Sequence, residues 1–226
     1  MLWLGGEPLI RTGLLREGLS LFRRNAVFTN GLRAVPRDLG CGVLVSLDGP
    51  RETNDALRGP GTWDRVTANL AAMDRPVVHC TITAKNPNIA GPLLESLDGL
   101  VGGVIFGLYT PRRGEDSEHV LSVEARHESV ATLRGLGASW DGLLLNTAGM
   151  LDSMDSDSAE WRSACPYRGG QAVALDHRLQ EKRPCSYGRG ADCERCGCVA
   201  THLRAAAKRG DPKALAILRA VFSTGV

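Results

Sequence analysis

Leu4-Gly5-Gly6-Glu7-Pro8 stands near the start of the sequence, directly after the apolar pair Leu2-Trp3. An apolar run that ends in two glycines is typical of a buried strand that turns into a loop. Glycine has no Cβ, so a ligand can approach the backbone there, and the Glu7 carboxylate suits an ammonium group. Pro8 fits the first turn of a following helix. The alternative is a plain strand-to-helix turn, and the later motifs are needed to choose between the two.

Apolar runs and helical patterns alternate along the residues that follow. The strands are apolar on both faces, which is typical of parallel βα units. We therefore expect an α/β fold. Its predicted elements are a helix at 9–24, strands at 26–28 and 42–47, a polar loop, a helix capped by Thr62, a strand at 76–84, a helix at 89–101, a strand at 103–109 and a helix around 123–136.

Polar and glycine-rich signals come directly after the predicted strands. In parallel α/β folds the carboxyl ends of the strands form the ligand-binding face, so these groups are expected to meet on one rim. They are Gly5-Gly6-Glu7, Thr29-Asn30-Gly31, Ser46 with Asp48, Thr83 with Asn86, and Thr110.

The pattern changes near residue 141. Leu143-Leu144-Leu145 is a candidate for one more strand, and the acidic, serine-rich 150–164 reads as a surface loop. The Cys-, Gly- and Arg-rich 165–198 contains one short apolar run at 172–175, a candidate strand. Two helices are expected to close the sequence. Asp211 and Pro212 should begin the last of them, with Leu215, Leu218 and Phe222 on one face.

The composition indicates one principal domain with a small extension. The chain has 226 residues, 43% of them hydrophobic, enough for a substantial core. A net charge of +2 gives no electrostatic reason to expect nucleic acid or an anionic membrane as partner. No apolar run approaches the ~20 residues that span a bilayer, and no signal-peptide pattern opens the sequence. We expect a cytoplasmic protein.

Four motifs, in this order and spacing, resemble the radical SAM enzymes. They are GGEP at 5–8, a strand ending in Thr29-Asn30-Gly31, Val-Ser-Leu-Asp-Gly-Pro at 45–50 and Leu-Arg-Gly-Pro-Gly-Thr-Trp-Asp-Arg-Val at 57–66. The resemblance covers 4–109. It implies an incomplete (βα)6 partial TIM barrel over 1–140, which binds S-adenosylmethionine and a 4Fe–4S cluster at the carboxyl rim.

The resemblance also implies the chemistry. Reductive cleavage of the sulfonium yields a 5′-deoxyadenosyl radical that attacks a substrate, and flavodoxin or ferredoxin supplies the electron. The substrate, a small molecule or a peptide, cannot be read from the sequence.

Site residues can be carried over by position. Gly5, Gly6 and Glu7, with Pro8 closing the motif, would meet the methionine amino group. Ser46 and Asp48 would face the ribose or the methionine carboxylate, and the Arg58 guanidinium can pair with that carboxylate bidentately. The remaining carried-over positions are Asn30 at the end of its strand, Asn86 near the nucleoside and Tyr109 near the adenine.

The sequence departs from the family in one respect. The CxxxCxxC loop, whose three thiolates hold the SAM-binding cluster, is absent. One interpretation is a truncated chain, in which the first strand and its cluster loop are missing; the other is a non-catalytic SAM-binding remnant. Either way, we expect the chain as written not to cleave S-adenosylmethionine.

Five cysteines crowd into the last third of the sequence. Four thiolates suffice for zinc or for a 4Fe–4S cluster. By resemblance, 141–226 is similar to the SPASM or twitch auxiliary-cluster extension, although the spacing is not a full match. The alternatives are structural zinc, as in a zinc-stabilised interaction module, and free cysteines of a broken site. The five are Cys165, Cys185, Cys193, Cys196 and Cys198.

Five cysteines compete for four ligand positions. Cys193 and Cys196 are the first choice because a CxxC turn brings both sulfurs to one metal, and Cys185 is next. For the fourth ligand we prefer Cys165. Cys198 lies where a helix is expected to begin, so its side chain is expected to point away.

Other candidates are weaker. Cys41 and Cys80 read as core thiols, and His79 as a packed or hydrogen-bonded strand residue. His119 and His127 are expected on a solvated surface near the charged 112–116 loop, which follows a strand and could instead cover a substrate. His177 and His202 flank the cysteines and are alternative zinc ligands, but neither is preferred.

Overall fold

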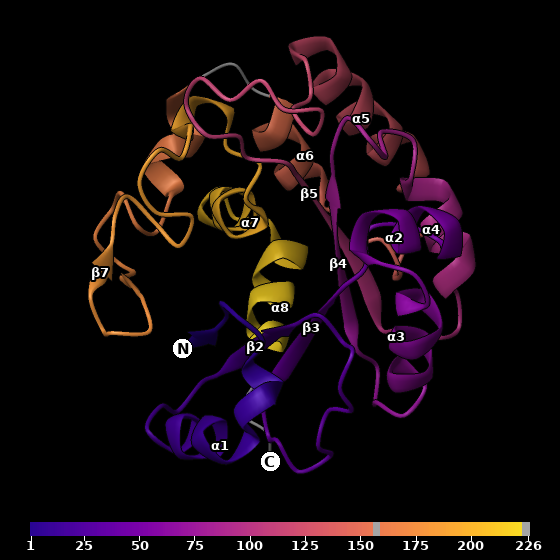
Figure 1. The fold of residues 1–226 in the computed structure, drawn as a ribbon. Helices are drawn as coiled ribbons and strands as arrows, with labels where there is room; N and C mark the ends of the chain where they lie inside the picture. Colours follow the sequence, from indigo (N-terminus) through magenta and orange to yellow (C-terminus); the bar gives the residue numbers. More distant parts are fainter. Residues whose placement is uncertain (156–158, 223–226) are drawn as a thin grey trace.

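The computed structural model describes residues 1–155 and 159–222. Five parallel strands form one sheet in the order in which they occur along the chain (Figure 1). The expected α/β fold, an incomplete partial barrel, is therefore confirmed. The strands are β1 (Leu2–Trp3), β2 (Ala26–Thr29), β3 (Gly42–Ser46), β4 (Val77–Ile82) and β5 (Gly103–Leu108).

Helices follow the strands as the sequence patterns predict. They are η1 (Pro8–Arg11) and α1 (Thr12–Ser20) after β1, α2 (Arg51–Arg58) and α3 (Thr62–Leu70) after β3, α4 (Ala90–Leu97) after β4 and α5 (Val123–Leu136) after β5. The helix α2 replaces the expected polar loop. Its buried residue is the polar Asn54, so hydrophobic periodicity could not reveal it. Gly61, and not Thr62, is the N-cap of α3.

One face of the sheet packs against α3, α4 and α5. Along β4, Val78, Cys80 and Ile82 are buried on this face, as the two-residue period of a strand requires. They join the largest apolar cluster of the protein. Its helical members include Val66 and Leu70 from α3, Leu93, Leu94 and Leu97 from α4, and Val130 and Leu133 from α5.

The opposite face of the sheet is covered by the end of the chain. Ile105 of β5 packs with Met150 of α6 (Ala148–Asp155), with Leu203 and Ala206 of α7 (Val199–Lys208) and with Ala214 of α8 (Pro212–Val221). Figure 1 shows α7 and α8 on the side of the sheet opposite to α2, α3, α4 and α5. Residues beyond 140 therefore share a core with the barrel. The division into 1–140 and 141–226 stays a proposal based on the change in sequence pattern.

The expectation of a surface loop at 150–164 is wrong for the described residues. Helix α6 and the 3-10 helix η2 (Ala159–Ala164) occupy most of this stretch, and 156–158 lie outside the described residues. Met150, Leu151 and Met154 are buried. Their helical spacing was masked by the aspartates and serines around them.

Two further expectations need correction. Leu143–145 form no strand, and Leu144 makes only isolated bridges to Val104 and to Asp141. In the bridge to β5, Val104 N–H donates to the Leu143 carbonyl (2.7 Å) and Leu145 N–H donates to the Val104 carbonyl (2.9 Å). Asp211 does cap α8 and accepts a hydrogen bond from Ala214 N–H (3.0 Å). Ala214 is the buried residue of α8, and Leu218 packs against the same apolar cluster, as expected, while Leu215 is 38% exposed.

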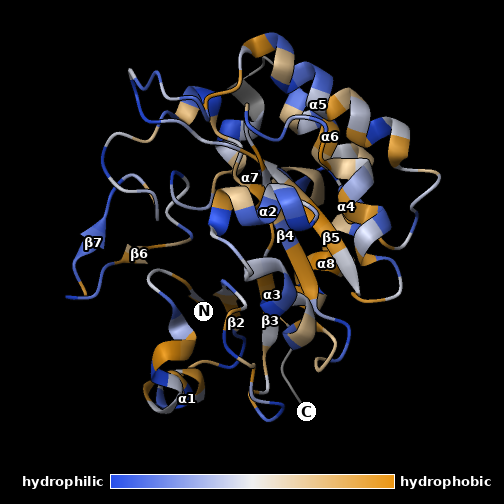
Figure 2. Cartoon of the chain, turned by 45° about the vertical axis from the view of Figure 1, so that its right-hand side comes forward, coloured by the Kyte–Doolittle hydropathy of each residue, from blue (hydrophilic) through white to orange (hydrophobic). Residues whose placement is uncertain are grey.

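A two-stranded antiparallel hairpin projects from the Cys-rich segment. It consists of β6 (Ala174–Leu175), within the run predicted as a short strand, and β7 (Glu181–Lys182). Figure 2 shows that β7 is hydrophilic and that the hairpin lies apart from the five-stranded sheet. In β6, Ala174 is buried whereas Leu175 is exposed. Among the helices of the described residues, none combines the length and the apolar character that crossing a membrane requires.

Candidate functional site

Glu7 follows β1 and connects it to the neighbouring strand. Its Oε1 accepts hydrogen bonds from the Thr29 hydroxyl (2.7 Å) and from Leu9 N–H (3.0 Å), and its Oε2 accepts one from Asn30 N–H (2.8 Å). The carboxylate therefore caps η1 and joins the ends of β1 and β2. An ionised carboxylate has about four lone-pair sites, so capacity for a further donor remains.

The two glycines before Glu7 leave the backbone open. Gly5 and Gly6 have φ values of 93° and 57°, in the left-handed region that favours glycine, and no atom lies within 4 Å of the place where a Cβ would stand. Pro8 begins η1 directly after the capping residue, as predicted. The start of the chain therefore offers accessible backbone beside a carboxylate.

A second polar network follows β3 and β4. An ion pair joins Arg58, at the end of α2, to Asp48 (2.7 Å), and both side chains are largely shielded from solvent. Asp48 Oδ1 accepts from Thr81 N–H (3.0 Å). The Asn86 amide donates to the Asp48 carbonyl (2.8 Å), and its oxygen accepts from Thr83 N–H (2.6 Å). The structure brings these predicted residues together, and the Arg58 guanidinium is already paired with the Asp48 carboxylate.

The remaining rim residues occupy different surroundings. Ser46 is half-buried beside His79 in the β3–β4 register. The Asn30 side-chain oxygen accepts from Leu32 N–H (2.9 Å). The Tyr109 hydroxyl donates to Glu115 (2.9 Å), and its ring centroid lies 6.0 Å from that of His119. The hydroxyl of Tyr109 is thus used within the loop after β5.

His79 is a packed residue of the sheet, as the sequence indicated. Its ring meets Phe28 edge-on, with centroids 5.0 Å apart. Burial lowers the pKa of His79 to about 4, although the nearby Asp48 carboxylate opposes this shift. The imidazole is therefore neutral at neutral pH.

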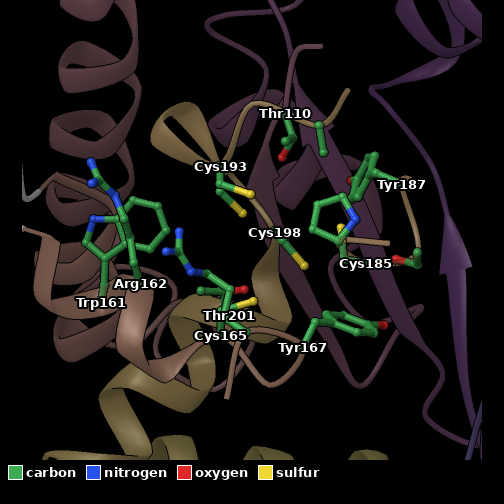
Figure 3. Close-up of a pocket in the computed structure, with 15 residues that line it drawn as sticks. Thr110, Trp161, Arg162, Cys165, Tyr167, Cys185, Tyr187, Cys193, Cys198 and Thr201 are labelled. Carbon is green, nitrogen blue, oxygen red and sulfur yellow. The ribbon is translucent and has the colours of Figure 1, made fainter. Parts of the chain in front are cut away.

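The five cysteines of the Cys-rich segment line one pocket. We call it the cysteine pocket, and it has a volume of about 30 Å³. Figure 3 shows the side chains of Cys165, Cys193 and Cys198 directed toward the same space, with aromatic side chains around them. Cys198 does not point away, so that expectation is wrong. The residues that line the cysteine pocket include Cys165, Cys185, Cys193, Cys196, Cys198, Trp161, Tyr167 and Tyr187.

Close backbone contact with β5 positions two of these cysteines. Leu108 N–H donates to the Gly197 carbonyl (3.1 Å), and Gly197 N–H donates to the Thr110 hydroxyl (2.9 Å). A Cβ at Gly197 would lie 2.0 Å from the Leu108 carbonyl oxygen, so a residue with a side chain cannot take this place without a shift. The glycine between Cys196 and Cys198 therefore fixes both against the end of the sheet.

The thiols of the pocket resist ionisation. Burial raises the pKa of Cys196 to about 12, and the neighbouring Cys198 and Cys165 add to the shift. Burial also raises the pKa of Cys185 and of Cys198, and the neighbouring cysteines add to both shifts. These thiols are therefore protonated at neutral pH in the metal-free protein, and a bound cation would favour the thiolate forms.

Basic side chains surround the turn that carries Cys193 and Cys196. Arg126 of α5 donates to the Cys196 carbonyl (3.3 Å) and to the Tyr109 carbonyl (3.3 Å). Arg195 donates to the Leu121 carbonyl, and burial lowers the pKa of Arg126, with Arg195 as a further cause. These arginines were not predicted from the sequence, because Arg126 lies seventy positions from Cys196, on a helix whose pattern indicated only packing.

The other candidate residues have structural surroundings. The Cys80 thiol is fully buried in the main cluster. His202 is buried with both ring nitrogens in use, Nδ1 beside the Ser153 hydroxyl (2.9 Å) and Nε2 beside the Cys196 carbonyl (3.1 Å). His127 pairs with Asp155 (2.7 Å). The three remaining candidates are half-buried Cys41 and His119 and exposed His177.

Among residues 1–155 and 159–222, no group of three or more His, Cys, Asp or Glu side chains is already arranged to hold a metal ion. The five cysteines are free thiols that share a pocket. Metal binding would therefore require their sulfur atoms to move closer together.

Comparison with solved structures shows the same fold. A structure described as native anSMEcpe with bound AdoMet superposes with a TM-score of 0.63 at 15% sequence identity, over 88% of this chain and 64% of that one. Structures of anSMEcpe with AdoMet and the Kp18Cys or Cp18Cys peptide superpose with TM-scores of 0.52 and 0.51, at 15% and 16% identity, over 68% of this chain and 52% of each.

The comparison therefore confirms the partial-barrel fold expected from the motifs. The chain spans 64% of the length of the first of these structures. No family model matches the sequence, and no curated protein matches it. At 15% identity, similarity to a solved structure shows the fold alone.

Proposed function

We propose that the chain is a radical SAM protein whose cysteine pocket holds an auxiliary 4Fe–4S cluster and whose rim binds S-adenosylmethionine. The observation that carries the proposal is the convergence of five cysteines from distant stretches on one pocket at the carboxyl end of β5. The fold supports it, because the similar anSMEcpe structures have AdoMet bound.

The donor set of the pocket fits a thiolate-bound cluster. Cys185, Cys193 and Cys196, with Cys165, are the proposed ligands, and the Arg126 guanidinium, which interacts electrostatically with Cys196, would offset part of the negative charge of four thiolates. When bound, such a cluster supplies electron transfer. Because the raised pKa values keep the thiols protonated, cluster assembly must release protons and become more favourable as the pH rises.

The rim fits the polar end of S-adenosylmethionine. The open backbone of Gly5 and Gly6 and the Glu7 carboxylate are proposed to receive the methionine ammonium. Arg58 is proposed to pair with the methionine carboxylate, and it would have to share its guanidinium with Asp48. Ser46, Asn30, Asn86 and Tyr109 are proposed to surround the rest of the molecule.

The reaction itself is a separate part of the proposal. The sequence has no CxxxCxxC motif, so no thiolate triplet is available to present an iron to the sulfonium. We therefore propose that the chain as written binds S-adenosylmethionine without cleaving it. In a protein that contains the motif, the substrate would be a peptide or a small molecule, the electron donor flavodoxin or ferredoxin, and the compartment the cytoplasm.

Three measurements on anaerobically purified protein test the proposal. Reconstitution with iron and sulfide should yield about four irons per chain, whereas zinc with no iron uptake would favour a zinc-stabilised module.

Isothermal calorimetry should show S-adenosylmethionine binding, weakened about ten- to a hundredfold by Glu7→Ala through loss of a charge-assisted hydrogen bond. Formation of 5′-deoxyadenosine with dithionite by the chain as written would contradict the expected lack of cleavage.

Ser20→Ala, in α1 away from the rim, is a suitable control for Glu7→Ala because it also removes a polar group. Its affinity for S-adenosylmethionine should equal that of the wild type. Equal affinity of Glu7→Ala and the wild type would remove Glu7 from the proposed site and leave it as the cap of η1.

A further inference from the structure

An open groove adjoins the cysteine pocket, and the two spaces share part of their lining. Its volume is about 640 Å³, and Tyr167, Arg168, Pro184 and Ala191 line both spaces. This volume is within the range of sites that bind drug-sized ligands or short peptides. The groove is formed by the β6–β7 hairpin, the turn at 167–170, the segment 189–191 and the loop after β5.

The groove concentrates positive charge. Four arginines and one glutamate line it, namely Arg113, Arg168, Arg183, Arg189 and Glu181. Glu181 is bonded to Arg183 (2.8 Å). Among the described residues, the other three guanidinium groups have no carboxylate partner, and all three residues are exposed. Four positive charges against one negative leave an excess of three in the groove, while the whole chain has a net charge of only +2.

The framework that carries these arginines is held by backbone bonds. Arg113 N–H donates to the Gly190 carbonyl (2.7 Å), and Arg112 forms an antiparallel bridge with Ala191. This pairing fixes Arg113 and Arg189 relative to each other. The hairpin is fixed by its own strand pairing, in which Ala174 lies opposite Lys182. A ligand would therefore meet arginines on a partly pre-organised surface, which reduces the entropy cost of binding.

Apolar side chains adjoin the charged ones. Val173 lines the groove and is 63% exposed, and Leu175 and Leu179 of the same hairpin are 50% and 80% exposed. Exposed large apolar residues next to a groove are typical of protein interaction sites. Within the described residues β6 has a strand partner only in β7, so an edge of the hairpin is available to an extended segment.

We propose that this groove binds an acidic peptide segment that carries apolar side chains between its carboxylates. The carboxylates would pair with Arg113, Arg168 and Arg189, and the apolar side chains would contact Tyr167 and Val173. A peptide fits better than a nucleic acid, because the positive charge is confined to the groove and the chain as a whole is nearly neutral. The proposal needs neither S-adenosylmethionine nor a metal centre, so it stands or falls separately from the proposed function.

Fluorescence anisotropy with a labelled peptide of alternating glutamate and leucine tests the proposal on the full chain. The wild type should bind it, with affinity falling as salt is raised. The double variant Arg113→Gln/Arg189→Gln should bind roughly tenfold more weakly, as expected for two solvent-accessible ion pairs. Arg65→Gln, which removes an exposed arginine of α3 outside the groove, is the matched control and should bind like the wild type.

Glu181→Gln should have the opposite effect, about threefold tighter binding, because it removes the one opposing carboxylate and frees Arg183. Thermal melts should show that all variants fold, since the Arg113 and Arg189 side chains make no hydrogen bond or ion pair with another residue of 1–155 or 159–222. Binding unaffected by the double variant would overturn the proposal. So would equal binding of a lysine–leucine peptide, or displacement of the acidic peptide by inorganic phosphate or by oligothymidylate at lower concentration than by unlabelled peptide.

Discussion

The rim and the cysteine pocket lie at the same carboxyl side of the sheet but differ in how their polar groups are satisfied. At the rim, Glu7, Asp48 and Asn86 are bonded to neighbouring strands, and Arg58 is paired. In the cysteine pocket, the sulfur atoms are brought together, and burial, together with the neighbouring cysteines, raises the pKa values of Cys185, Cys196 and Cys198. The polar groups of the rim are stabilised by hydrogen bonds and an ion pair within the protein. The thiols of the pocket, in contrast, would repel one another when ionised.

This difference indicates what each region requires from a ligand. Carboxylates and amides that already bond protein can add a ligand with little change, so the rim should be equally well folded with or without one. Thiols that repel one another as thiolates gain most from a cation between them. We therefore expect large effects on metal content from changes in the pocket and modest effects on stability from changes at the rim.

The largest effect is expected from Cys193→Ala, which should abolish iron binding because it removes one sulfur of the CxxC turn. Cys41→Ala, outside the pocket, is the control and should retain the full iron content. Cys165→Ala should also lose the cluster and Cys198→Ala should keep it, because four thiolates suffice for one cluster and Cys165 is the proposed fourth ligand.

Iron counting and Mössbauer spectroscopy measure these outcomes. Loss of the cluster with Cys198→Ala and retention with Cys165→Ala would reverse the choice of the fourth ligand. Retention of four irons in Cys193→Ala would contradict the whole assignment, because no other pair in the segment has the CxxC spacing.

The pH dependence of stability should report on His79. The folded-state pKa of about 4 lies below the usual 6.5, so the unfolded chain takes up the proton first. The free energy of unfolding is therefore highest above about pH 6.5, where His79 is neutral in both states. It falls by about 3 kcal/mol as the pH drops toward 4. His79→Gln should reduce this loss, measured by urea unfolding between pH 7 and 4.5. His177→Gln, on the exposed hairpin, should leave it unchanged.

Gly197→Ala tests the contact between the pocket and β5. The added methyl group would meet the Leu108 carbonyl oxygen at 2.0 Å, so the backbone must move, at a cost of about 1–3 kcal/mol. Iron content should fall as well, since Cys196 and Cys198 would be displaced. Gly135→Ala in α5 has no atom within 4 Å of its Cβ and should be neutral or slightly stabilising. Equal melting temperatures for Gly197→Ala and Gly135→Ala would contradict the close approach of Gly197 to the Leu108 carbonyl.

Arg58→Gln should have the smallest effect. It leaves the partly shielded Asp48 carboxylate without its ion pair and should destabilise the fold by about 1–2 kcal/mol, between the values for exposed and buried pairs. The matched control is Arg51→Gln, whose partner Asp64 is 60% exposed; a change within about 0.5 kcal/mol is expected there. A larger loss for Arg51→Gln in thermal unfolding would show that shielding does not govern these pairs.

Much of the fold could be predicted from the sequence, because the β strands are short apolar runs bounded by turn signals. The helix α2 could not be, since Asn54 and not an apolar stripe is its buried residue. Helix α6 was obscured by serines and aspartates around Met150, Leu151 and Met154. In both cases tertiary contacts outweigh the local composition.

The candidate site shows a similar division. The identities of Glu7, Asp48 and Arg58 followed from a motif series. The bonds of Glu7 to Thr29 and Asn30 and the ion pair of Arg58 with Asp48 depend on how β2, β3 and α2 are placed, which spacing does not encode. The convergence of Cys165 with the later cysteines depends on η2 and on the docking of Gly197 against β5. The arginines near the pocket come from separate elements, so no local pattern could identify them.

Alkylation mapped by mass spectrometry tests most directly whether the cysteine pocket holds one metal centre. The chain is treated with iodoacetamide before and after anaerobic loading with iron and sulfide, and the labelling rate of each cysteine is compared. The account predicts that Cys165, Cys185, Cys193 and Cys196 become strongly protected together while half-buried Cys41 keeps its rate. Unchanged labelling of all five pocket cysteines after loading would contradict it.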